Sequence, residues 1–228
     1  LQHEDGHSHL LAYPQPNLRA YDPAFAYEAA VIVEDGIHRM YVEQENIFYY
    51  ITAYNENYPQ PPMPDGVKDG IIRGIYTLKR SDMDGNGPTA NLLGSGPILN
   101  HAIEAALLLE EKYNVASNIY SVTSYKQLYM DQQETCRWNM MHPGEKPRIS
   151  YARELLKDEQ AVYVAASDYV RALPDLISAS VPGRFMTLGT DGFGRSDSRE
   201  ALRNFFEVDS RYIVLAALYG LALDGQIP

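Results

Sequence analysis

The sequence ANLLGSGPILNHAIEAALLLEEKYNVASNIYSVTS (residues 90–124) contains the alternation that decides the fold. It begins with an apolar segment that runs into a glycine turn at Gly94 and Gly96. Apolar side chains then recur every three to four residues from Leu99 to Tyr113, which is the period of a helix. NIYSVTS, at its end, is typical of a second strand. A strand, a helix and a second strand in this order predict two parallel strands joined by a crossover helix.

Two later segments extend this sheet. AVYVAAS (residues 161–167) is apolar enough to be a strand covered on both faces, and RFMTLGT (184–190) is typical of a fourth strand. The segment between them is helix-like, but Pro174 is expected to kink or split that helix. The predicted fold class is therefore α/β, with three layers and a mainly parallel sheet.

Polar residues mark the expected helix starts. Asp22 can cap a helix in YDPAFAYEAAVIVEDGIHRMY, with Pro23 at its first position. Asp197 and Glu200 have the spacing of a capping box before ALRNFFEV. Asp209 can cap the last helix, SRYIVLAALYGLAL.

A proline-rich stretch, ENYPQPPMPDGVKDG (residues 56–70), divides the chain. Its prolines fit neither a helix interior nor a central strand, so they predict an extended connector between two units. Before it, NIFYYITAY (46–54) has the aromatic and β-branched composition of a buried strand. We therefore expect the end of one α/β domain at residues 1–56, a linker at 57–74 and a complete domain at 75–228.

Composition limits the possible partners. With 45% hydrophobic residues, the chain has the composition of a globular protein. Its net charge of −11 argues against a nucleic acid or an anionic membrane as partner. The single cysteine, Cys136, cannot form an internal disulfide, which fits a reducing, cytoplasmic location. No apolar run reaches the roughly 20 residues that a membrane helix needs.

Several polar motifs have structural explanations. The turn LLGSGP lacks the third glycine of a dinucleotide fingerprint and is expected to be a tight strand-to-helix connection. GTDGFGRSDSRE lies where open α/β sheets bind ligands, but capping and turn geometry account for its residues. His142 is expected to be a hydrogen-bonded loop residue, whereas His38 and His101 are expected to face solvent.

LQHEDGHSH (residues 1–9) is the motif with the most chemistry. His3, His7 and His9 with nearby carboxylates could bind zinc, but their spacing matches no strong zinc pattern, so we predict no metal site. A loop with several imidazoles is suited to proton transfer and to binding developing negative charge.

Taken together, LQHEDGHSH, YDPAFAYE, YYITAYNENY, LLGSGPIL, YSVTSY, RWNMMHP and LGTDGFGRSDSRE resemble the homodimeric pyruvate dehydrogenases, the first component of the bacterial pyruvate dehydrogenase complex. These enzymes are part of the wider transketolase-like, thiamine-diphosphate-dependent group. The resemblance runs along nearly the whole chain. It implies that residues 1–56 end a pyrimidine-binding domain and that 75–228 form a transketolase C-terminal-like domain.

The resemblance implies oxidative decarboxylation of pyruvate on thiamine diphosphate and transfer of the acetyl group to lipoyl groups of the second component, a dihydrolipoamide acetyltransferase. It implies that His3 assists turnover in the active-site channel, with His9 second and His7 third as catalytic candidates. It also implies a homodimer.

The family's magnesium and diphosphate motif, Gly-Asp-Gly followed by Asn, and its cofactor-activating glutamate are not among these 228 residues. DGNG (84–87) is instead expected to be a turn between strands. We therefore expect no cofactor-binding residues here and no activity from these residues alone. The alternatives are a noncatalytic dimerisation or binding module, a transketolase or another 2-oxo acid dehydrogenase.

Overall fold

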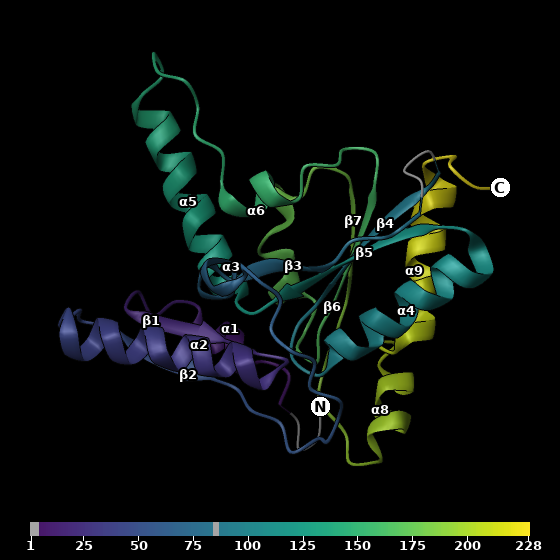
Figure 1. The fold of residues 1–228 in the computed structure, drawn as a ribbon, viewed down its shortest axis with the longest axis horizontal. Coiled ribbons are helices and arrows are strands. Elements are labelled where there is room, and N and C mark those ends of the chain that lie inside the picture. Colours follow the sequence, from purple (N-terminus) through teal and green to yellow (C-terminus); the bar gives the residue numbers. More distant parts are fainter. Residues whose placement is uncertain (1–4, 84–86) are drawn as a thin grey trace.

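The structure, a computed structural model, describes residues 5–83 and 87–228. Figure 1 shows a five-stranded sheet with helices on both faces and a smaller two-stranded sheet beside it. The predicted three-layer α/β fold with a mostly parallel sheet is thereby confirmed. No helix among the described residues is both long and apolar enough to cross a bilayer.

The small sheet and its helices come first in the chain. Its two strands are parallel, and Leu18 pairs with Phe48. The elements of this part are α1 (Ser8–Ala12), β1 (Leu18–Tyr21), α2 (Ala26–Ile37), the π-helix η2 (His38–Val42) and β2 (Phe48–Ile51).

The larger sheet has the strand order β3-β5-β4-β6-β7, and only the edge strand β3 is antiparallel. Its elements are α3 (Lys68–Arg73), β3 (Ile75–Lys79), β4 (Thr89–Gly94), α4 (Ile98–Tyr113), β5 (Ala116–Val122), α5 (Tyr125–Met141), α6 (Tyr151–Leu155), β6 (Val162–Ala166), α7 (Ala172–Asp175), the 3₁₀ turn η3 (Ser178–Ser180), β7 (Arg184–Leu188), α8 (Arg199–Phe205) and α9 (Ser210–Leu223).

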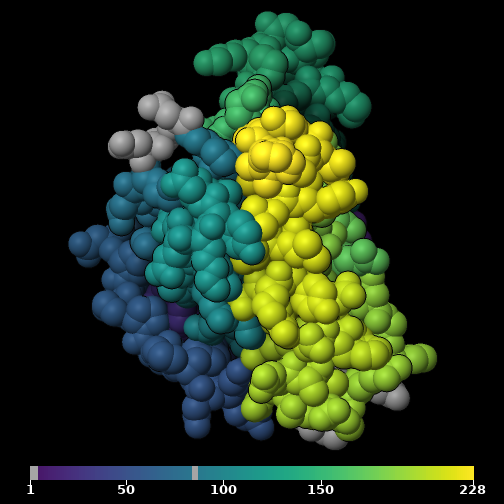
Figure 2. All heavy atoms as spheres, turned by 90° about the vertical axis from the view of Figure 1, so that its right-hand side faces the viewer, coloured from purple at the N-terminus to yellow at the C-terminus, as the bar shows by residue number. Residues whose placement is uncertain are grey.

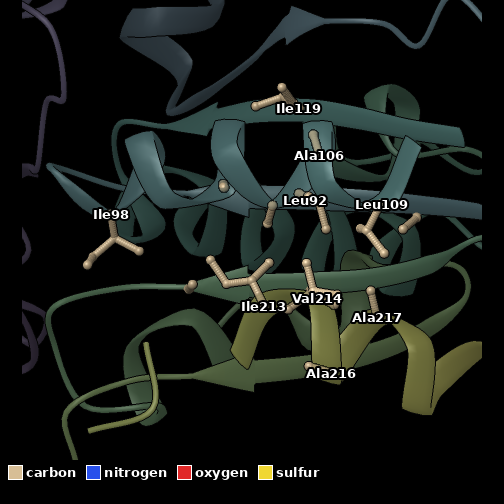
Figure 3. Close-up of a cluster of buried hydrophobic side chains, with 14 of the residues drawn as sticks. Leu92, Ile98, Ala106, Leu109, Ile119, Ile213, Val214, Ala216 and Ala217 are labelled. Carbon is tan, nitrogen blue, oxygen red and sulfur yellow. The ribbon is translucent and has the colours of Figure 1, made fainter. Parts of the chain in front are cut away.

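Successive residues of the central strands enter two separate cores. Leu92 of β4 packs with α4 and α9 on one face, whereas its neighbour Leu93 packs with side chains of α5, α6 and α7 on the other. Figure 3 shows the first core, and Figure 2 shows α4 and α9 side by side over it. Strands buried on both faces have continuous apolar sequences, which is why β4 and β6 could be predicted.

The structure confirms the strand-to-helix turn after β4. A side-chain Cβ at Gly94 would lie 2.6 Å from the Leu99 Cα, so only glycine allows this approach. Gly96 has a left-handed backbone with φ of +49°. Asp209 caps α9 as predicted, by accepting from the backbone N–H groups of Arg211 and Tyr212. Pro174 lies within the short α7, and the expected helix is split.

Two predicted helix starts are wrong. Asp22 does not cap α2; the buried Glu28 carboxylate accepts from the backbone N–H groups of Ala24 and Phe25 instead. The start of α8 is displaced by one residue, because Ser198, not Asp197, accepts from the Ala201 N–H. The Asp22 carboxylate is instead bound by the Thr52 hydroxyl, and the residue after Asp197, Ser198, is the N-cap of α8.

NIFYYITAY does contain a strand, but the prediction that this strand is buried is wrong. Its strand, β2, is only half-buried, and Phe48 is 46% exposed. The sequence patterns predict no element at α1, β1, α3, β3, α5 or α6. Helix α5 has no continuous apolar stripe, because its buried residues lie in its first half, while the rest projects from the body of the molecule (Figure 1).

The lone histidines have structural surroundings. His38 is exposed and lies 3.2 Å from Glu43, and His142 is bound through Nδ1 to the Trp138 carbonyl, both as expected. His101 is a correction: its side chain is half-buried, and burial lowers its pKa. Residues 84–86 of the DGNG turn lie outside the described residues.

Candidate active site

The loop that carries the histidine motif is folded by its own polar atoms. The Asp5 carboxylate accepts from the backbone N–H groups of His7 and Ser8 and from the Ser8 hydroxyl, at 3.1–3.3 Å. The carbonyl of Gly6 accepts a 2.9 Å hydrogen bond from the Val170 N–H, just after β6. These bonds place residues 5–9, here called the histidine loop, over the carboxyl ends of the parallel strands, where open α/β sheets commonly bind ligands.

His9 lies in α1 and is almost completely buried. Its ring contacts Tyr50 and Tyr169 edge-on, with ring centroids 5.3 and 4.6 Å away. Its Nε2 is 3.2 Å from the Thr52 hydroxyl. Burial lowers the His9 pKa to about 4, so the imidazole is neutral at pH 7.

Asp22 follows β1 and is the second buried group of the site. Its Oδ1 accepts a 2.7 Å hydrogen bond from the Thr52 hydroxyl. Burial raises the Asp22 pKa to about 6, although the hydroxyls of Thr52, Ser95 and Tyr54 favour the ionised form. Thr52 thus joins Asp22 to His9.

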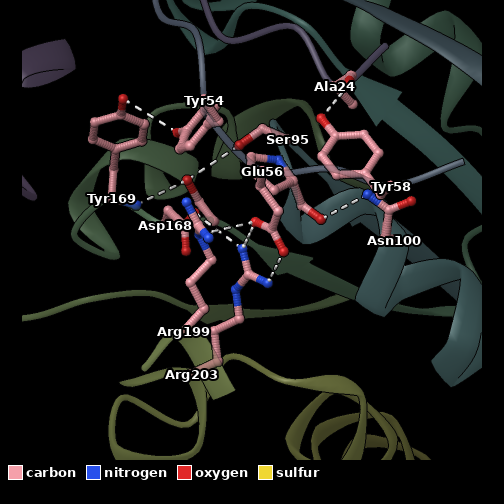
Figure 4. A network of polar contacts seen from close by, with 12 residues as sticks. Ala24, Tyr54, Glu56, Tyr58, Ser95, Asn100, Asp168, Tyr169, Arg199 and Arg203 are labelled. Carbon is pink, nitrogen blue, oxygen red and sulfur yellow. Dashed lines mark hydrogen bonds and ion pairs between the residues drawn. The ribbon is translucent and has the colours of Figure 1, made fainter. Parts of the chain in front are cut away.

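A cavity of about 490 Å³ lies beside this chain of contacts. The Tyr54 hydroxyl donates to the Tyr169 hydroxyl at 3.3 Å in its wall (Figure 4). The cavity is lined by the ends of β2 and β6, the start of α8 and the histidine loop, through Asp5, Thr52, Ala53, Tyr54, Asn55, Asp168, Tyr169, Asp197, Arg199, Leu202 and Arg203.

Charged groups close one side of the cavity. Arg203 binds both carboxylate oxygens of Glu56, at 2.8 and 2.5 Å, and Figure 4 shows this bidentate pair. Asp168 is 4% exposed and lies 3.9 Å from Arg203, and burial raises its pKa to about 6. The Glu56–Arg203 pair joins the segment after β2 to α8.

Of the three histidines predicted to be catalytic, two lie among the described residues, and they differ in burial. His3 lies outside the described residues. His7 is half-buried at the start of α1, and His9 is buried two residues later. The roles of all three stay predictions.

Asp22, Thr52, Asp168 and the Glu56–Arg203 pair were missed by the sequence analysis. Asp22 has an ordinary explanation as a helix cap, which hid its burial. Its position directly after a strand was a usable signal, because strand ends carry ligand-binding groups in such sheets.

The described residues do not fit a magnesium–diphosphate site. The cavity presents the carboxylates of Asp168 and Asp197, which repel phosphate, and both of its arginines, Arg199 and Arg203, lie within ion-pair distance of Glu56. Over residues 5–83 and 87–228, no three His, Cys, Asp or Glu side chains lie close enough to share a metal ion. Because His3 and Glu4 lie outside these ranges, the zinc prediction is not tested.

The GTDGFGRSDSRE segment has only part of the structural role predicted for it, because Asp197 does not cap α8 and instead lines the cavity with Arg199. Asp191 binds the backbone N–H and the side chain of Arg171, and the Arg195 guanidinium lies 4.1 Å from the Phe205 ring centroid. Its start supports the histidine loop, because a Cβ on Gly6 would be 3.2 Å from the Thr190 carbonyl oxygen. The two motifs therefore meet in space.

Comparison with known proteins matches both parts of the chain to families. Residues 1–61 match the family model of the pyruvate dehydrogenase E1 component middle domain, and residues 74–209 match that of the transketolase-like C-terminal domain.

Two curated relatives, both named pyruvate dehydrogenase E1 component, align with the whole chain. The protein from Escherichia coli strain K12 is 52% identical over 229 residues, which cover 100% of this chain and 25% of the relative. The protein from Pseudomonas aeruginosa is 50% identical over 228 residues, covering 100% and 26%. The chain thus spans about a quarter of the length of these relatives.

Among solved structures, transketolase from Leishmania mexicana superposes with a TM-score of 0.65 at 16% identity, covering 99% of this chain and 29% of that chain. This similarity shows the fold alone. The chain belongs to the transketolase-like C-terminal domain family, in the form found in the C-terminal part of pyruvate dehydrogenase E1 components.

Proposed function

We propose that this chain is the C-terminal part of a thiamine-diphosphate-dependent pyruvate dehydrogenase. The intact protein would decarboxylate pyruvate oxidatively and pass the acetyl group to lipoyl groups of a dihydrolipoamide acetyltransferase. The observation that carries the proposal is identity of about half of all residues along the whole chain with proteins of that name. The transketolase neighbours, at 16% identity, do not favour transketolase activity.

The residues of this chain would supply proton-transfer and positioning groups. We propose His3 as the main catalytic residue, because the loop that follows it packs over the carboxyl ends of the strands. His7, half-buried on that loop, is a further candidate. His9 is neutral at pH 7, so we assign it a hydrogen-bonding role rather than proton shuttling as a cation.

Thiamine diphosphate and magnesium would be bound by residues elsewhere in the intact protein, because the described carboxylate-lined cavity does not fit them. The cofactor would stabilise the carbanion that decarboxylation creates. We propose residues 1–56 as the end of the pyrimidine-binding domain, 57–74 as the linker and 75–228 as the C-terminal domain. We also propose that the intact protein is a homodimer in the cytoplasm.

The test is an assay of the full-length gene product with pyruvate, thiamine diphosphate, Mg²⁺ and an isolated lipoyl domain. Acetylation of the lipoyl group, followed by mass spectrometry, is the expected result. His3→Ala should lower turnover by roughly a hundredfold, the scale of one acid–base group. The exposed His38 provides the matched control, because His38→Ala should leave turnover unchanged.

A parallel assay with sugar-phosphate donors and acceptors measures ketol transfer. Ketol transfer without pyruvate-dependent acetylation would contradict the proposal and would favour a transketolase. Acetylation that survives His3→Ala in full would contradict the role of His3.

A further inference from the structure

Asp22 is a buried carboxylate that accepts one short side-chain hydrogen bond, from Thr52, with the hydroxyls of Ser95 and Tyr54 near it. It is 3% exposed, and its Oδ1 accepts from Thr52. Its Oδ2 makes no hydrogen bond with the described residues and faces Gly96, where a Cβ would lie only 2.8 Å away. Burying a carboxylate destabilises the folded chain when one of its oxygens accepts no direct hydrogen bond, so its position calls for a reason other than stability.

Thr52 has one hydroxyl proton and two acceptors for it. Its Oγ1 lies 2.7 Å from Asp22 Oδ1 and 3.2 Å from the Tyr21 carbonyl oxygen. A carbonyl oxygen and an ionised carboxylate can only accept, so the hydroxyl must donate to one of them. The third neighbour of Thr52 Oγ1, His9 Nε2 at 3.2 Å, must therefore be the donor.

This donor requirement selects one tautomer of His9. A neutral imidazole carries a single N–H, so a proton on Nε2 leaves the lone pair on Nδ1. The ring cannot readily turn to exchange the two nitrogens, because Tyr50 and Tyr169 pack against it edge-on. The chain Asp22–Thr52–His9 is thus directional from His9 to the carboxylate.

We propose that Asp22 and Thr52 are positioning residues, which hold His9 as its Nε2–H tautomer and thereby fix the histidine loop over the strand ends. The link to turnover rests on the proposed pyruvate dehydrogenase function; the tautomer does not. His9 is the second residue of α1 and the last residue of the loop, and the hydrogen bond from the Val170 N–H to the Gly6 carbonyl anchors the loop near its start. Loss of either anchor would let the loop move relative to the cavity.

Thr52→Val removes the hydroxyl at nearly constant volume, and Thr52→Ser restores it. In the full-length protein labelled with ¹⁵N-histidine, solid-state NMR reports which ring nitrogen carries the proton at pH 7.5. The His9 signals are identified by their loss in His9→Gln. We expect a protonated Nε2 in the wild type and in Thr52→Ser, and a mixture of tautomers in Thr52→Val.

The same variants are then assayed with pyruvate. Thr52→Val should lower kcat about tenfold with little change in KM, because one buried hydrogen bond is lost. Thr52→Ser should recover most of kcat, and Asp22→Asn, which keeps an acceptor for Thr52, should fall between them.

The two readouts separate the claims. A protonated Nδ1 in the wild type, or an unchanged tautomer in Thr52→Val, would overturn the positioning by Thr52. A tautomer change without any loss of kcat would overturn its link to turnover. A wild type that shows the expected tautomer but no activity on pyruvate would contradict only the proposed function.

Discussion

The five-stranded sheet and the N-terminal two-stranded sheet are held by different forces. Central strands β4 and β6 are covered on both faces by apolar side chains. Strand β2 is half-buried, and much of what fastens its region to the larger sheet is polar, such as the 2.6 Å bond from the Ser124 hydroxyl to the Ala20 carbonyl and the Glu56–Arg203 pair. The first region thus depends on its own core, whereas the second depends on its neighbour.

This difference bears on function, because the candidate site lies between the two regions. The histidine loop, Asp22 and Thr52 come from the region with the smaller core, and the supporting carbonyl and amide groups come from the larger sheet. Local openings are cheaper where fewer apolar contacts must break. The site would therefore be rigid on one side and able to adjust on the other.

The largest effect should come from the apolar core. Leu92→Ala should lower the free energy of unfolding of the 228-residue chain by about 4 kcal/mol, because Leu92 is fully buried and its removal leaves a cavity. Leu107→Ala, at an exposed position of α4, is the matched control and should change it by less than about 0.5 kcal/mol. Urea denaturation measures both. Similar losses in the two variants would refute the placement of the core.

The polar contacts of Glu28, which join α2 to β3 and β5 of the larger sheet, should contribute somewhat less to the free energy of unfolding. Glu28 accepts from two backbone N–H groups and from the hydroxyls of Tyr76 and Ser121, and it is fully buried. Glu28→Ala removes the carboxylate that accepts from these four donors, of which only the Tyr76 hydroxyl has another partner among the described residues, Tyr27, and should lower the free energy of unfolding by about 3 kcal/mol. The control is Glu34→Ala, because Glu34 is exposed on the same helix. Equal losses of unfolding free energy in the two variants would show that Glu28 does not hold the two regions together.

Much of this contrast was readable in the sequence. Apolar runs and helical periodicity predicted β4, α4, β5, β6 and β7, because strands buried on two faces leave little room for polar residues. The N-terminal region was harder. Its strand β2 has the composition of a buried strand but is half-buried here. The burial of Asp22, Glu28 and Thr52 depends on partners 30 to 93 residues away, which no local pattern reports.

The next effect is a pH dependence with opposite signs for Asp22 and His9. The Asp22 pKa rises from 3.8 to about 6 on folding, so the folded state binds more protons and loses stability as pH rises from about 4 to 6. The His9 pKa falls from 6.5 to about 4, so stability increases as pH rises through the same range. Each contribution to the free energy of unfolding is on the order of 3 kcal/mol.

As the pH rises from 4 to 6.5, the stability of Asp22→Asn should therefore increase relative to the wild type, whereas that of His9→Gln should decrease relative to the wild type. Chemical denaturation at several pH values measures both differences. Parallel pH profiles for the two variants would refute the assignment of these buried states.

The smallest effect should come from an exposed ion pair that joins α2 of the N-terminal region to α3. Lys68 Nζ lies 3.4 Å from Glu34, and both side chains are mostly exposed. Lys68→Ala should change the free energy of unfolding by less than about 0.5 kcal/mol, because solvent screens such pairs. Thermal unfolding at low and high salt checks this, and a loss above 1 kcal/mol would show that surface charges help to hold the region.

Native-state hydrogen exchange of the 228-residue chain tests the difference between the two regions most directly. Amides of β4, β5 and β6 should exchange only by global unfolding, with the largest free energies of opening. Amides of β1 and β2 should exchange through a smaller opening that leaves the five-stranded sheet folded, and Glu28→Ala should speed their exchange selectively. Equal free energies of opening for β1, β2 and the central strands would contradict this account, because both regions would then share one cooperative core.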